Sequence, residues 1–398
     1  MSDSSQSTEA GPPPHMGTLA RVFLRISLLG FGGPNAHLAL MLDEVVDRRK
    51  WITREHFLHL VGVTNLLPGP NSSEVAIHIG YTQRGWKGAL TTGLAFLLPT
   101  FFLVVLFSAL YFRYGNLPQV EGVFWGLKPA VLAIILAAGW KLAGAALEPR
   151  SLILRALALG GVATALFLDR WEVAAMALGG AAGWALFRTG PRKRTAAPDG
   201  DGTTSLSALL LLPASGLLGT LSLPPLLHLF GLMLGTGAVL FGGGYMLVAL
   251  LEPFVVEAYG WLTPQQFLDG IALTQAVPGP IVTLVAFVGY AVAGAPGAAL
   301  ATAGIYLPSF AAVLAVAPHL ERWRKREGIK AALKGVNAVV AGAILGVGLT
   351  LIPSAVQDGW SAALALLALA ALVGLRARAI WVVGGGVVAG LLHLLLTG

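Results

Sequence analysis

Two proline-glycine turns interrupt long apolar stretches of this 398-residue chain. The first is Pro68-Gly69-Pro70, within Leu67–Glu74, and the second is Pro278-Gly279-Pro280. Neither turn can continue a helix, because each proline lacks an N–H donor and clashes with the turn before it. Lipid cannot satisfy the backbone groups that such a break exposes, so the break must be buried in protein or face a water-filled cavity. The two turns therefore predict interrupted helices around an internal polar site.

The composition indicates that the apolar stretches lie in a lipid bilayer. Hydrophobic residues make up 56% of the chain and charged residues only 11%, whereas a soluble domain has roughly 25% charged residues. The formal net charge is +7, but lysine and arginine in such a protein mark cytoplasmic loops, so we expect no nucleic-acid partner. The chain has no cysteine, which excludes disulfides, thiolate metal sites and cysteine nucleophiles. We therefore expect an all-α polytopic membrane protein.

The sequence also contains an internal duplication. The motif Phe31-Gly32-Gly33-Pro34 returns as Phe241-Gly242-Gly243-Gly244, at the same separation as the two Pro-Gly-Pro turns. Further matches, with one deletion among them, are Trp51 with Trp261, Gly88-Ala89 with Gly297-Ala298, Leu98-Pro99 with Leu307-Pro308, and Gly126 with Gly335. These matches run from Phe31 to Gly126 in the first half and from Phe241 to Gly335 in the second, with one gap. Such an extended match predicts two homologous halves.

The duplication divides the chain into segments. We assign residues 1–16 to a disordered cytoplasmic tail without a signal peptide, 17–189 to the first repeat, 190–205 to a linker, 206–225 to an extra transmembrane segment, and 226–398 to the second repeat. The extra segment has no partner in the first half, so it adds one membrane crossing before the second half begins. We therefore expect the second half to be upside down, as an inverted-topology repeat with broken or re-entrant helices.

The charged loops predict how the first two apolar elements of each half fold. One basic cluster is Arg48–Lys50, whereas the corresponding loop of the second half has only Glu252 and Glu257. If these elements turn back at their breaks, every basic cluster is cytoplasmic and the acidic loop is external, which is the usual distribution. We therefore predict helical hairpins, a cytoplasmic N-terminus and an external C-terminus. Each element is also long enough to span the membrane with a kink, since about 20 residues suffice.

Each break starts a half-helix whose first turn offers free N–H groups and a partial positive charge. Two such helix starts that meet from opposite sides form a preorganised anion site. The candidate substrate-binding residues at the breaks are Gly32, Gly33, Asn35, Asn65, Gly69, Asn71, Ser72, Ser73, Gly242, Gly243, Gln275 and Gly279. Asn65 and Gln275 either offer amide N–H groups to an anion or cap the broken helices. The alternative for the whole set is that the turns only kink packed helices.

Ionisable residues inside the apolar stretches add candidates, because they are costly there and often functional. Arg25 carries a planar guanidinium group that suits a tetrahedral oxyanion. Lys128 is a second candidate substrate-binding cation, and its counterpart in the other half is the neutral Asn337. Glu74 is a candidate proton carrier, since a lone carboxylate in a membrane avoids the cost of a buried charge by taking up a proton. The alternative for Glu74 is a salt bridge to Lys128 or Arg25.

These motifs resemble those of the chromate ion transporter family, in its long-chain form with two domains. The resemblance is carried by Phe31–Pro34 with His37, Trp51, Leu67–Pro70, Gly80-Tyr81 and Leu98-Pro99, and by their second-half copies. It implies a secondary active transporter of the cell membrane that exports chromate, driven by the proton motive force. It also implies that Arg25, the turns, Lys128 and Asn337 serve the anion path. Two positions depart from the family pattern: Asn65 replaces a glutamine, and Gly244 replaces the proline of the first motif.

We expect the substrate to be chromate or a similar tetrahedral oxyanion, with protons as coupling ions and with no cofactor or metal. Sulfate shares the charge and shape of chromate, so it is an alternative substrate. An uncoupled anion channel would share these sequence features and would differ in lacking coupled proton flux. An intramembrane enzyme acting on lipid phosphates would need a metal set or a nucleophile–base pair. The eight histidines do not have metal-ligand spacing, so we expect no enzymatic activity.

Overall fold

The computed structural model describes residues 13–31, 33–64, 67–115, 117–148, 151–168, 171–187, 225–241, 244–317 and 327–397. Most of the predicted tail, the predicted linker, the extra segment up to residue 224, and the candidates Gly32, Asn65, Gly242 and Gly243 lie outside these residues. Within the described residues every regular element is a helix, which confirms the all-α class.

The helices of the first half are interrupted where the turns predict. They are α1 (Met16–Leu29), α2 (Pro34–Met41), the π-helix η1 (Leu42–Arg48), α3 (Arg54–Thr64), α4 (Asn71–Tyr114), α5 (Pro118–Ala146), α6 (Leu152–Phe167) and α7 (Glu172–Phe187). The second half contains α9 (Pro225–Val239), α10 (Met246–Glu252), η3 (Pro253–Ala258), α11 (Pro264–Ala276), η4 (Ile281–Thr283), α12 (Leu284–Val316), α14 (Glu327–Thr350), α15 (Ile352–Ala355), α16 (Gly359–Val373) and α17 (Ala379–Thr397).

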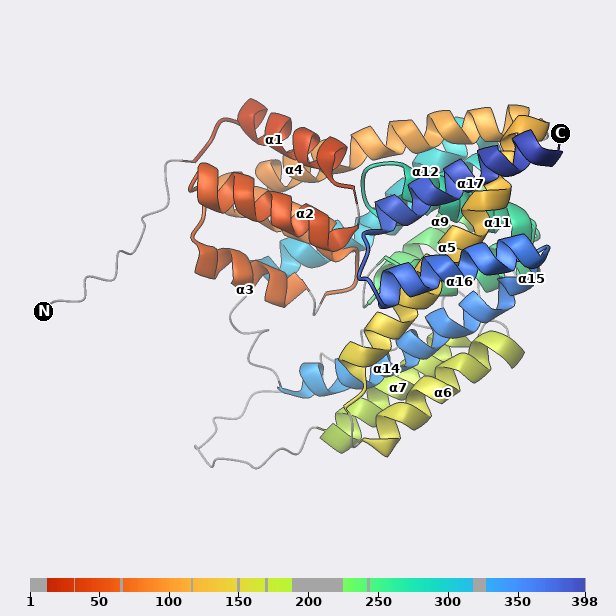
Figure 1. The fold of residues 1–398 in the computed structure, drawn as a ribbon. Helices are drawn as coiled ribbons and strands as arrows, with labels where there is room; N and C mark the ends of the chain where they lie inside the picture. Colours follow the sequence, from red (N-terminus) through yellow and green to blue (C-terminus); the bar gives the residue numbers. More distant parts are fainter. Residues whose placement is uncertain are drawn as a thin grey trace, which may run out of the picture.

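The first two apolar elements of the first half fold as hairpins. The side-chain amide of Gln83 donates to the backbone oxygen of Trp51 (3.1 Å). The guanidinium group of Arg84 donates to the backbone oxygens of Pro13 and Pro14 (3.0 and 2.9 Å). These contacts bring the start of α1, the end of η1 and a bend in α4 to one end of the molecule, at the left of Figure 1. The chain therefore turns back at each break, as the predicted hairpins require.

The bend in α4 is a second tight reversal. Gly85 has a φ of +59° there, and the segments before and after it run antiparallel. The hydroxyl of Thr92 donates across the pair to the backbone oxygen of Ala76 (2.8 Å). Gly80 and Gly88 lie in contact, and a Cβ atom on either would collide with the backbone of the other. After the bend, α4 extends toward the opposite end of the molecule (Figure 1).

The second half repeats this arrangement. The helix α12 bends at Gly294, which has a φ of +61°, and Gly289 and Gly297 lie in contact across that bend. The rings of His228 and Tyr259 lie 6.1 Å apart between centroids, so the start of α9 lies near the end of η3. Both halves thus carry two hairpins followed by a long helix.

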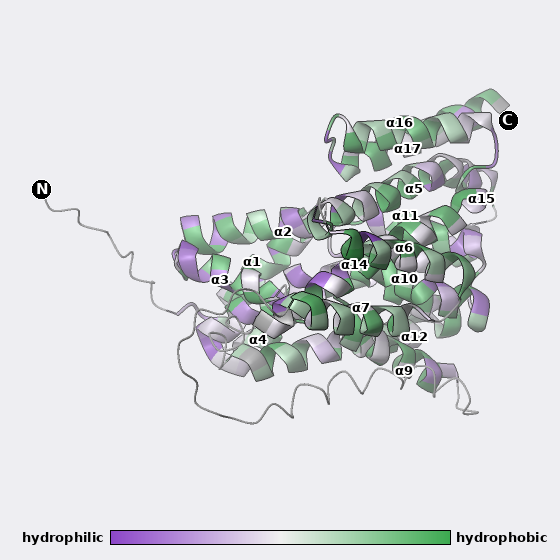
Figure 2. Ribbon diagram, turned by 90° about the horizontal axis from the view of Figure 1, so that it is seen from below, coloured by the Kyte–Doolittle hydropathy of each residue, from purple (hydrophilic) through white to green (hydrophobic). Residues whose placement is uncertain are grey.

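Five helices of the described part are long and apolar enough to cross a membrane. They are Asn71–Tyr114, Pro118–Ala146, Ile281–Ala315, Lys330–Thr350 and Ala379–Leu396. Figure 2 shows hydrophobic residues along most of the helices and hydrophilic residues mainly near helix ends and turns. Together with the composition, these helices make this a membrane-embedded protein.

One long helix of each half packs against helices of the other half, an arrangement we call the exchange of helices. The first-half helix α5 packs against α16 and α17, and the second-half helix α14 packs against α6 and α7. Glycines let these backbones approach closely: Gly126 lies against Gly386, and Gly335 lies against Gly179. Small residues at helix crossings are typical of membrane proteins, in which packing rather than hydrophobicity holds helices together. Gly126 and Gly335 are matched positions of the duplication, so both halves use the same surface for the exchange.

Candidate functional site

The predicted turns meet in two pairs, and each pair joins the halves. The backbone N–H of Gly69 donates to the carbonyl oxygen of Leu240 (2.7 Å), and that of Gly279 donates to the carbonyl oxygen of Gly30 (3.2 Å). Gly69 and Gly279 have φ values of +149° and +127°, which other residues rarely adopt. Each Pro-Gly-Pro turn is thus hydrogen-bonded to the glycine turn of the other half. We call the described parts of these turns, within residues 30–33, 67–70, 240–244 and 277–280, the junction.

Two hydroxyl groups reach the junction from matched positions. Thr100 of α4 donates to the carbonyl oxygen of Pro278 (2.9 Å), and Ser309 of α12 lies against Gly69. Each Pro-Gly-Pro turn therefore has one hydroxyl group beside it, supplied by the long helix of the opposite half. A Cβ atom on Gly69 or Gly279 would collide with these hydroxyl groups, so glycine is required there by packing as well as by φ.

A buried carboxyl group also lies at the junction. The side chain of Glu74 is completely buried, and a Cβ atom on Gly69 would touch it. Neither of its oxygens has a hydrogen-bond partner among the described residues, and the same holds for the buried hydroxyl group of Ser309. The buried hydroxyl groups of Ser73 and Tyr306 lie beside each other. Buried polar groups are normally satisfied, so the Glu74 carboxyl and Ser309 hydroxyl groups are available for further hydrogen bonds at the junction.

Glu74 has no salt bridge to either of the cations suggested by the sequence. The Arg25 Nη1 atom lies 3.7 Å from Glu44 Oε1, and the Arg25 side chain is 62% exposed. The Lys128 Nζ atom instead lies 3.3 Å from Asp269 Oδ1. The predicted alternative of a salt bridge from Glu74 to Lys128 or Arg25 is therefore wrong. Arg25 also lies apart from the buried polar groups of the junction.

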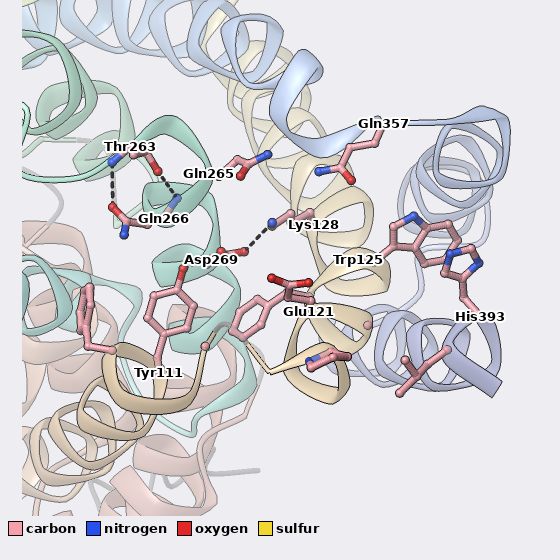
Figure 3. Close-up of a pocket in the computed structure, with 16 residues that line it drawn as sticks. Tyr111, Glu121, Trp125, Lys128, Thr263, Gln265, Gln266, Asp269, Gln357 and His393 are labelled. Atoms are coloured by element: carbon pink, nitrogen blue, oxygen red, sulfur yellow. Dashed lines mark hydrogen bonds and ion pairs between the residues drawn. The ribbon is translucent and has the colours of Figure 1, made fainter. Parts of the chain in front are cut away.

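A cavity of about 760 Å³ lies where α4 ends and where α5 and α11 begin. Figure 3 shows charged and aromatic side chains from these helices and from α17 around it. They include Tyr111, Glu121, Trp125, Lys128, Asp269 and His393. The lining therefore comes from both halves of the chain.

An ion pair between the halves forms part of the cavity wall. It joins Lys128 of α5 to Asp269 of α11, and the side chains are 12% and 7% exposed. The hydroxyl of Tyr111 donates to Asp269 Oδ2 (2.7 Å). A buried ion pair adds little net stability, because desolvation offsets the Coulomb attraction. Both side chains of the pair line the cavity.

Other predicted residues hold the turns in place. The amide oxygen of Asn71 accepts from the Thr64 hydroxyl (2.7 Å) across the break between α3 and α4. The amide of Gln275 donates to the Tyr245 hydroxyl (2.9 Å) and so fixes α11 to the chain after the second glycine turn. The remaining described candidates are Gly33, which is partly exposed, Asn35, which is exposed, Ser72, which is buried, and Asn337, whose buried oxygen has no hydrogen-bond partner among the described residues.

Sequence reasoning missed Asp269 and Tyr111. Asp269 lies in an apolar stretch, so the rule that selected Lys128 and Glu74 would also have selected it. Tyr111 carries no such signal, because a tyrosine near a helix end is common at a membrane interface. The described residues contain no group of three or more histidine or acidic residues that could hold a metal ion.

Comparison with known proteins finds similarity to chromate transport proteins along most of the chain. The family model for chromate transporters matches residues 17–184 and 227–391. The chain is 34% identical to the chromate transport protein of Cupriavidus metallidurans, over 92% of this chain and 90% of that protein. It is 33% identical to the chromate transport protein of Pseudomonas aeruginosa, over 85% and 81%. It is 31% identical to the probable chromate transport protein of Synechococcus elongatus, over 87% of each chain. No solved structure matches the chain.

Proposed function

The chain belongs to the chromate transporter family, and we propose that it exports chromate, or another tetrahedral oxyanion such as sulfate, from the cytoplasm under the proton motive force. Membrane ion transport follows from the family. Direction, coupling and the choice of anion are our proposal. The observation that carries it is the junction, in which the interrupted helices of one half are hydrogen-bonded to those of the other.

The proposed anion site lies at the start of α4. The first turn of a helix presents backbone N–H groups and a partial positive charge, which favour an anion. The buried Ser309 hydroxyl group has no hydrogen-bond partner among the described residues, and the buried hydroxyl groups of Ser73 and Tyr306 lie beside each other. These three groups can donate to oxyanion oxygens. Asn71 and Gln275 contribute by holding the turns.

Glu74 is the proposed proton carrier. A charged carboxylate beside the start of α4 would repel a dianion, so a proton on Glu74 accompanies anion binding. A dianion with one proton still carries net negative charge. The membrane potential is negative inside and acts on each transported charge. It therefore drives the complex outward, whereas the pH gradient, acidic outside, opposes the outward movement of the proton, so the electrical part of the proton motive force is the driving part.

We propose that the halves form an inverted repeat and rock about the junction. In such transporters a fixed midplane site is exposed to each side in turn. Gly69 is hydrogen-bonded to Leu240, and Gly279 is hydrogen-bonded to Gly30. Gly69 matches Gly279 and Gly30 matches Leu240 in the duplication, so the two hydrogen bonds are equivalent, as a twofold axis through the junction would require.

Uptake by everted membrane vesicles tests the proposal. Everted vesicles that contain the protein should accumulate labelled chromate when respiration makes their interior positive and acidic, and a protonophore should abolish the accumulation. Vesicles without the protein are the control, and labelled sulfate is measured in parallel. Equilibration without accumulation would identify an uncoupled channel, and accumulation of sulfate alone would replace chromate as the substrate.

A further inference from the structure

We propose that Asp269 is a built-in competitor for the transported anion. In this proposal an oxyanion that enters the cavity takes the place of the Asp269 carboxylate beside Lys128, and the ion pair between the halves opens as the anion binds. The inference rests on the proposed function and adds to it a second anion position, outside the junction, together with a means of controlling it.

The geometry makes Lys128 the anion-binding group of this cavity. Among the described lining residues it is the only lysine or arginine, and Figure 3 shows its side chain directed at Asp269 from the cavity wall. A cavity of about 760 Å³ has ample room for a tetrahedral oxyanion with part of its hydration shell. Two carboxylates, Asp269 and Glu121, line the same cavity, so an anion that enters it has Lys128 as its one lysine or arginine partner among the described lining residues.

Asp269 is held in a way that allows exchange. Its Oδ1 atom pairs with Lys128, at 3.3 Å from Nζ. Its Oδ2 atom accepts from the Tyr111 hydroxyl at 2.7 Å. When an oxyanion displaces Oδ1 from Lys128, Tyr111 still holds the other carboxylate oxygen, so the released group keeps one partner. Carboxylate and oxyanion oxygens both accept hydrogen bonds and carry negative charge, so they compete for one ammonium group.

The exchange links anion binding to the contact between the halves. Lys128 belongs to α5 of the first half and Asp269 to α11 of the second, and these helices pack against each other beside the cavity. With the ion pair intact, the halves are tied at this end of the molecule. Anion binding at Lys128 removes that tie and leaves the other contacts between the halves in place, so α5 and α11 can shift against each other beside the cavity once an anion has arrived.

The test measures anion affinity of the purified full-length protein. Equilibrium dialysis with labelled sulfate and labelled chromate at low ionic strength gives a Kd for each variant. Asp269→Asn removes the competing charge and should tighten binding by about tenfold, as expected for a unit charge a few Å away in a partly screened site. Lys128→Gln should weaken anion binding and lower the number of anions bound per protein at saturation, because the cavity position is lost. Glu121→Gln is the matched control: it removes an exposed charge from the same cavity without freeing Lys128, so it should change the Kd less than Asp269→Asn.

The direction of the effects separates this role from a structural one. If the ion pair only stabilised the fold, Asp269→Asn and Lys128→Gln would change affinity in the same direction, and that result would overturn the proposal. Wild-type affinity in both variants would overturn it as well. Tyr111→Phe provides a variant that keeps both charges: it leaves Asp269 dependent on Lys128 and should weaken anion binding, whereas tighter binding would contradict the proposal. If the wild type bound neither oxyanion, the proposed substrate class would itself be wrong.

Discussion

At the scale of single residues, Glu74 carries the coupling prediction. Its carboxyl group is buried at the junction without a hydrogen-bond partner among the described residues. Glu74→Gln imitates the protonated side chain, so everted vesicles with this variant should still take up chromate but should no longer respond to an imposed pH gradient. Glu55→Gln is the matched control, because the Glu55 side chain is 85% exposed and should leave the response unchanged. Proton-coupled uptake by Glu74→Gln would exclude Glu74 as the carrier.

The contact partners of single ionisable residues could not be predicted from the sequence. Lys128 could be selected from sequence because an ammonium group in an apolar stretch is unusual. Its partner could not be assigned, since the pairing with Asp269 depends on how α5 and α11 pack. Arg25 was selected by the same rule, yet its side chain is largely exposed and pairs with Glu44. Residue type and hydropathy indicate that an ionisable group is unusual, but the packing decides which group it contacts.

At the scale of helices, the bend in α4 depends on the contact between Gly80 and Gly88. Gly80→Ala places a Cβ atom against the backbone of Gly88, so it should destabilise the protein by about 1–3 kcal/mol, the usual cost of overpacking. Gly62→Ala is the control, because a Cβ atom at Gly62 in α3 meets nothing within 4 Å and alanine favours a helix. Thermal denaturation of the purified variants should show a lower Tm for Gly80→Ala alone. Equal Tm values would show that α4 tolerates separation of the paired segments.

Sequence patterns predicted the helix breaks better than the helix bends. Two prolines around a glycine exclude a continuous helix, so the breaks near Gly69 and Gly279 followed directly from residue chemistry. The bends at Gly85 and Gly294 have no such signal, because a single glycine is tolerated inside a helix. The charge pattern nevertheless favoured hairpins over kinked spans, and the contacts of Gln83 and Arg84 agree with hairpins.

At the scale of the whole molecule, the exchange of helices between the halves could not be predicted from sequence. The duplication predicts two similar units, but it does not say whether each unit packs on itself. In the structure α5 packs on α16 and α17, while α14 packs on α6 and α7. Each half therefore completes the other, and neither is expected to fold alone. The exchange also means that any rocking of one half against the other must slide α5 and α14 along glycine-lined crossings.

The orientation of the halves is the prediction that belongs to this scale. An inverted repeat places the loop after η1 on the cytoplasmic side and the end of η3 on the external side, so the basic cluster at Lys50 and the acidic loop at Glu257 should face opposite solutions. The chain has no cysteine, which allows Lys50→Cys and Glu257→Cys to be labelled singly with a membrane-impermeant maleimide. Both positions are exposed. In intact cells Glu257→Cys should be labelled and Lys50→Cys protected, with the reverse in everted vesicles. Labelling of both positions from the same side would rule out the inverted repeat, and with it a transport site built from two oppositely directed sets of interrupted helices.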